Sequence, residues 1–78
     1  LEAGFEIFPN PATSIVNIKS SLNGEAQVNI VDMTGRCVRQ VVTDVENATI
    51  SVEGLNKGVY FISVQQDNNY SIQKLVVE

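Results

Sequence analysis

The sequence lacks histidine and tryptophan and contains a single cysteine, Cys37, among its 78 residues. Histidine is the commonest general base and metal ligand, so its absence removes every Ser–His and Cys–His nucleophile pair. A lone cysteine cannot form an internal disulfide, and within an expected strand Cys37 is interpreted as a small buried hydrophobe. These absences predict a chain that is not an enzyme, with no catalytic residue, no cofactor and no metal site.

Positive charge is scarce as well. Five Lys and Arg residues stand against nine Asp and Glu residues, and the cations do not cluster in the sequence. Because nucleic-acid binding needs a basic face that neutralises phosphates, we expect no nucleic-acid partner. No apolar run approaches the ~20 residues of a transmembrane helix, and no signal peptide opens the sequence. Leu1 is not a natural start residue, so we expect a piece of a longer protein whose export signal lies upstream.

Acidic and amide side chains gather at two expected turns, residues 44–47 and 67–69. Turn chemistry explains both clusters, and calcium binding is the weaker alternative because neither has the ligand spacing of a calcium loop. Residues 47–49 also fit the N-glycosylation sequon, which matters only for an exported eukaryotic protein.

What the sequence does contain is β structure. Short runs rich in Val, Ile, Thr, Tyr and Phe alternate with turn residues at spacings of roughly 8–12 residues, the pattern of a sandwich or barrel. Seven antiparallel strands in so short a chain need two packed sheets, since an open sheet would expose an apolar face. We therefore predict an all-β, seven-stranded antiparallel β-sandwich with strands at residues 5–8, 15–19, 26–32, 36–43, 49–52, 59–65 and 70–77.

Period-two alternation assigns the faces of these strands. In the fourth run, Val38 and Val42 are expected to share one face, with Gln40 between them. Tyr60 is expected to bury its ring while its hydroxyl finds a partner at the edge of the sandwich. The expected core-facing residues of the third, fifth and sixth runs are Ala26, Val28, Ile30, Ile50, Val52, Tyr60, Ile62 and Val64.

Four sequence motifs follow one another along the chain. They are Phe-Pro-Asn-Pro at residues 8–11, Asp-Met-Thr-Gly-Arg at 32–36, Leu-Asn-Lys-Gly-Val-Tyr-Phe-Ile at 55–62 and Lys-Leu-Val-Val at 74–77. In this order and spacing, nearly the whole chain, from Phe5 to Glu78, resembles the C-terminal sorting domain of cargo proteins of the type IX (Por) secretion system of Bacteroidetes. Phe8 stands where tyrosine is common in that family, and Arg36 stands where lysine is common.

The resemblance implies a fold and a route of export. It implies an immunoglobulin-like β-sandwich over residues 5–78, preceded by a linker end at 1–4 and joined to an N-terminal cargo domain in the same chain. It implies that the cargo passes through the periplasm and then through an outer-membrane translocon to the cell surface or the medium. It further implies that a sortase-like cysteine protease cuts upstream of the domain, before or around residues 1–4, and that the cargo can be attached to a surface lipopolysaccharide.

The candidate sorting residues come from the four motifs. We hypothesise that the last strand and the turn carrying Gly35 and Arg36 form the recognised surface, by apolar docking or strand addition, with Lys74 setting the register. The alternative is that the last strand is simply core. The candidates are Pro9, Asn10, Pro11, Gly35, Arg36, Gly58, Tyr60, Lys74, Leu75, Val76 and Val77.

One other functional class stays open at this point. A fibronectin-like or immunoglobulin-like spacer or ligand-binding module of a secreted multidomain protein would share the strand pattern, although the chain has no tryptophan for a glycan-binding platform. In either case an exposed edge strand would allow weak homodimerisation by strand pairing.

Overall fold

The computed structural model describes residues 5–20, 24–44 and 46–78, which form β-strands joined by turns. Each of the seven predicted runs is a strand, and no boundary differs from the prediction by more than one residue. The strands are β1 (Phe5–Phe8), β2 (Ile15–Ser20), β3 (Glu25–Val31), β4 (Cys37–Asp44), β5 (Ala48–Ser51), β6 (Gly58–Gln66) and β7 (Asn69–Val77).

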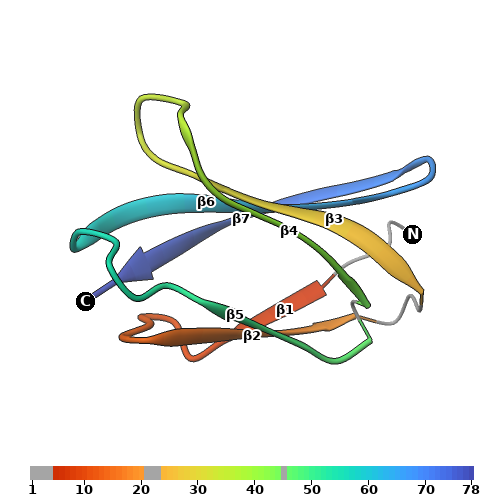
Figure 1. Cartoon of the computed structure of the whole chain (residues 1–78), viewed down its shortest axis with the longest axis horizontal. Coiled ribbons are helices and arrows are strands. Elements are labelled where there is room, and N and C mark those ends of the chain that lie inside the picture. Colours follow the sequence, from red (N-terminus) through yellow and green to blue (C-terminus); the bar gives the residue numbers. More distant parts are fainter. Residues whose placement is uncertain (1–4, 21–23, 45) are drawn as a thin grey trace.

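The strands form two antiparallel sheets that face one another (Figure 1). One sheet has three strands in the order β1-β2-β5, and the other has four in the order β4-β3-β6-β7. The prediction of two packed antiparallel sheets is therefore confirmed. β1 and β5 are the edges of the three-stranded sheet, and β4 and β7 are the edges of the four-stranded sheet.

The core lies between the sheets and follows the predicted alternation. All eight residues expected to face inward from the third, fifth and sixth runs are buried. Each large apolar side chain in this layer contributes roughly 1.5–3 kcal/mol by leaving water. The largest side chains with almost no exposed surface are Ile18, Ile30, Ile62, Leu75, Val16, Val28 and Val52.

The prediction for the faces of β4 is wrong. Val42 is 63% exposed, whereas Val38 and Val41 pack against the core. The cause is a bulge opposite the end of β3: Ile30 pairs with Arg39, Val31 pairs with Cys37, and Val38 has no partner of its own. An extra residue in one strand shifts the alternation by one position, so the inward set changes at Val38.

The same bulge region corrects the prediction for Cys37. This residue is exposed at the start of β4 rather than buried. Its register partner is Val31, which alternates with the buried Ile30 and so lies on the outer face of the four-stranded sheet. The Cys37 thiol donates to the backbone oxygen of Arg39, with 3.2 Å between the two atoms.

Candidate functional site

The four sequence motifs lie at one end of the sandwich, on the left in Figure 1. The turn after β1, the turn after β3, the connection after β5 and the last residues of β7 all reach this end, because successive strands run in opposite directions. We call it the motif end and define it by residues 8–12, 32–36, 54–60 and 74–78.

Asn10 joins the first motif to the last. Its side-chain amide donates to the backbone oxygen of Lys74 at 3.2 Å, and its side-chain oxygen accepts the backbone N–H of Val76 at 3.0 Å. Ala12 continues the contact, since its N–H donates to Val76 and its carbonyl accepts from Glu78, both at 2.8 Å. The Asn10 amide thus takes the place of a strand residue beside β7, and Pro9 and Pro11 flank it at exposed positions.

The candidate residues of β7 divide between the two faces of the strand. Leu75 and Val77 are 0% and 3% exposed, so they belong to the core and are not available for apolar docking by the folded domain. Lys74 is exposed and Val76 is half-buried on the outer face. The outer edge of β7 from Lys74 to Glu78 is already paired by Asn10 and Ala12, so strand addition there would require their displacement.

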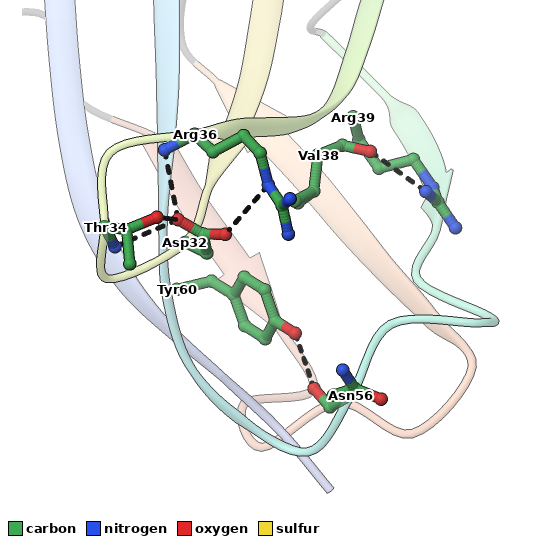
Figure 2. Close-up of polar contacts among 7 residues, drawn as sticks. All are labelled: Asp32, Thr34, Arg36, Val38, Arg39, Asn56 and Tyr60. Atoms are coloured by element: carbon green, nitrogen blue, oxygen red, sulfur yellow. Dashed lines mark hydrogen bonds and ion pairs between the residues drawn. The ribbon is translucent and has the colours of Figure 1, made fainter.

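Asp32 organises the turn that carries Gly35 and Arg36 (Figure 2). One carboxylate oxygen accepts the Thr34 N–H at 2.9 Å, the Thr34 hydroxyl at 2.6 Å and the Arg36 N–H at 3.0 Å. Its second oxygen lies 3.4 Å from Nε of Arg36. Gly35 has φ 90°, in the left-handed region that favours glycine.

The hydrogen bonds of this turn also change the acidity of the Asp32 side chain. The bond from the Thr34 hydroxyl, followed by the bond from the Arg36 backbone, holds the pKa of Asp32 below its ordinary value. Both bonds favour the ionised carboxylate, as does the positive charge of Arg36.

The connection from β5 to β6 forms the other wall of the site. The Tyr60 hydroxyl donates to the backbone oxygen of Asn56 at 2.6 Å, which confirms the expected partner for a buried tyrosine ring (Figure 2). The Arg39 guanidinium donates to the backbone oxygens of Val38, at 2.9 Å, and of Glu53. Gly58, with φ 154°, begins β6 opposite Val77.

A groove of about 420 Å³ lies between these two walls. It is lined by residues 32–34, 36, 38 and 54–60, and we call it the motif groove. Its polar and charged groups include Asp32, Arg36 and Lys57, and its apolar groups include Met33 and Leu55. Two motifs that are separate in the sequence thus form one concave surface.

Charge is distributed unevenly along the sandwich. Among the described residues, the half next to the motif end carries four cations and three carboxylates, and the other half carries one cation and five carboxylates. The formal net charges are therefore +1 and −4. The first half contains Arg36, Arg39, Lys57, Lys74, Asp32, Glu53 and Glu78; the second contains Lys19, Glu6, Glu25, Asp44, Glu46 and Asp67.

The structure places the sequence-predicted candidates at the motif end, but some line the motif groove, some contact β7 and some are buried in the core. Arg36 lies on one wall of the motif end, and Gly35 belongs to the same turn, where its N–H donates to the Asp32 carbonyl. Gly58 and Tyr60 lie on the other wall, and Asn10 contacts β7. Sequence reasoning did not select Met33, Leu55 or Lys57. The sequence signal that could have identified these three residues is that they belong to the motifs at 32–36 and 55–62.

Neither a metal-binding cluster nor a membrane-spanning helix occurs in the described part of the chain. Within residues 5–20, 24–44 and 46–78, no three Asp, Glu, His or Cys side chains meet in a group that would hold a metal ion. The same residues contain no helix long and apolar enough to cross a membrane. Asp44 serves turn geometry, since its carboxylate accepts the Glu46 N–H at 2.9 Å.

Comparison with known proteins supports the family that the four motifs suggest. A search of curated proteins finds no match to this chain. The family model described as "Secretion system C-terminal sorting domain" matches residues 6–78, which is almost the entire chain. The chain therefore belongs to the family of C-terminal sorting domains that direct proteins through the outer membrane by type IX secretion.

Proposed function

We propose that the outer-membrane translocon of the type IX system reads this domain in its folded state, at the motif end. One observation carries the proposal: four motifs spread over residues 8–77 come together at one end of the sandwich (Figure 1). Asn10 and Val76, which share a hydrogen bond, are 66 positions apart in the chain. A signal read as an unfolded segment would have no need of such contacts.

The strand order supports an immunoglobulin-like classification for this scaffold. The orders β1-β2-β5 and β4-β3-β6-β7 correspond to strands A-B-E and C′-C-F-G of immunoglobulin-like sandwiches. Tyr60 lies near the start of β6, and its hydroxyl bonds to the backbone four residues upstream. This is the arrangement of the tyrosine corner at the start of strand F.

The position of β1 supports cleavage upstream of the domain. Phe5 begins β1 opposite Ser20, at the end of the sandwich far from the motif end. An N-terminal cargo domain would therefore leave the sorting domain on the side away from the recognised surface. A sortase-like cysteine protease would then cut before Phe5, and the cargo would reach the cell surface or the medium after its passage through the periplasm.

In this proposal the domain supplies recognition and performs no chemistry. The translocon contributes transport, and the protease contributes bond cleavage and attachment of the cargo to a surface lipopolysaccharide.

The test is export of a reporter. The chain, with its natural upstream linker, is fused to a periplasm-targeted fluorescent protein in a Bacteroidetes cell with a working type IX system. We expect the reporter on the surface or in the medium, and its loss from both when the translocon is disabled. A reporter retained in the periplasm while the domain is folded contradicts the proposal.

A matched pair of variants in β7 tests whether the folded state is read. Leu75→Asp places a charge in the core and should unfold the domain, since Leu75 is 0% exposed. Ile72→Asp changes the same strand at a position that is 52% exposed and should leave the fold intact. We expect export with Ile72→Asp and retention with Leu75→Asp. Equal export of the two variants contradicts reading of the folded state.

A further inference from the structure

We propose that the motif groove binds an acidic, extended segment of a protein in the type IX machinery, with Arg36 and Lys57 holding its carboxylates and Met33 and Leu55 contacting a neighbouring apolar side chain. This inference rests on the proposed function and names the chemistry of the partner at the recognised surface.

The walls of the motif groove are held in place before any partner binds. The Asp32 carboxylate fixes the first wall through three hydrogen bonds to Thr34 and Arg36. The second wall is fixed by the bond from Tyr60 to Asn56 and by the bond from the Leu55 N–H to the Val52 carbonyl at 3.2 Å. A groove with fixed walls binds with a smaller loss of conformational entropy than a mobile loop.

Both cations of the motif groove have hydrogen-bond donors to spare. The Arg36 side chain is 78% exposed, and it contacts Asp32 through Nε, so its two terminal nitrogens face solvent and suit a bidentate contact with a carboxylate. Lys57 is exposed, and no described residue pairs with its ammonium group. The lining of the motif groove therefore contains two cations, Arg36 and Lys57, and one carboxylate, Asp32.

The charge distribution favours an acidic partner at this end over the other. The half with the motif groove has a formal net charge of +1, whereas the described remainder has −4. An acidic surface would be attracted to the motif end and repelled by the opposite end, which orients the domain during encounter.

Apolar groups beside the cations favour a peptide over a phosphate group. Met33, at the tip of its turn, is 67% exposed, the highest fraction among the large hydrophobic residues that the structure describes. Its unbranched side chain adapts to different apolar partners. Leu55 is half-buried on the facing wall. A phosphate would use the cations alone, whereas a peptide can place a carboxylate and an apolar side chain side by side.

The experiment compares two Lys-to-Glu substitutions, each of which replaces one positive charge by one negative charge. Lys57→Glu acts in the motif groove, and Lys19→Glu acts on an exposed lysine of β2 in the acidic half. In the reporter assay above, we expect Lys57→Glu to lower surface delivery by about tenfold or more, from the loss of a charged contact and its replacement by repulsion. Lys19→Glu should match the unaltered chain, and Lys57→Arg, which keeps the positive charge, should be exported better than Lys57→Glu. Melting curves of all variants should coincide within a few degrees, since both lysines are exposed.

The outcomes separate this inference from the proposed function. If the unaltered chain is exported through the translocon and Lys57→Glu is exported equally well, the groove inference fails and the sorting role stands. Equal loss in Lys57→Glu and Lys19→Glu also overturns it, because the effect would then follow total charge. If the unaltered chain is not exported, the proposed function fails and the inference fails with it.

Cross-linking then identifies the partner chemistry directly. A photoreactive diazirine amino acid at position 33, in the exporting cell, should cross-link to a carboxylate-rich segment of a type IX component. A cross-link that maps to a basic or uncharged segment, or to lipid, overturns the proposed acidic partner.

Discussion

Asn10 is the position at which a small change should have the clearest structural effect. Asn10→Ala removes two hydrogen bonds to the edge of β7, at 3.2 Å to Lys74 and 3.0 Å to Val76. Each such bond contributes about 0.5–1.5 kcal/mol to stability, and both are exposed, so water can partly replace them. We expect a loss of about 1–2 kcal/mol in the free energy of unfolding, which for a domain of this size lowers Tm by roughly 5–10 °C.

Thermal unfolding and amide hydrogen exchange measure this effect. The Val76 amide donates to Asn10 and should exchange faster in Asn10→Ala, whereas the buried amide of Ile62 in the sheet centre should change only by the global loss of stability. Asn47→Ala is a suitable control, because Asn47 is exposed in a turn and should change stability by less than about 0.5 kcal/mol. An unchanged Tm together with unchanged Val76 exchange would refute the role of Asn10.

The remaining predictions concern the core, the tyrosine and the aspartate turn. Leu75→Ala should destabilise the domain by about 2–4 kcal/mol because its side chain is 0% exposed, while Ile72→Ala should have a much smaller effect in denaturant titration. Tyr60→Phe keeps the ring and loses the 2.6 Å bond to Asn56, so we expect a loss of about 1 kcal/mol in the same measurement. Because the pKa of Asp32 is lowered in the folded state, its contribution to stability is present above the unfolded pKa of about 3.9 and is lost as pH falls through the folded value. Asp32→Asn should therefore flatten this part of the pH dependence; an acid profile identical to that of the unaltered chain would contradict the role of Asp32.

The strand pattern could be read from the sequence because it depends on local chemistry. Alternation in residues 26–30 and 60–64 assigns side chains to the solvent-facing or the core-facing side of each strand, independently of the rest of the chain. Turn residues mark where each strand ends. The absence of histidine likewise restricts the possible chemistry before any fold is known.

The faces of β4 show where local reasoning fails. Its alternation changes at Val38 because Val31 pairs with Cys37 and Ile30 pairs with Arg39. The position of such a bulge depends on how the neighbouring strand pairs, so periodicity within β4 alone places Val42 on the wrong side.

The sequence by itself determined the seven strands, most of the core and the order of the four motifs. Only the tertiary structure decided that these motifs share one end, that Asn10 lies beside β7 and that Arg36 and Lys57 line the same groove. The physical reason is distance along the chain. Strand formation follows from neighbouring residues, whereas contacts such as Asn10 with Val76 exist only once the packing of two sheets has overcome the entropy of closing the intervening chain.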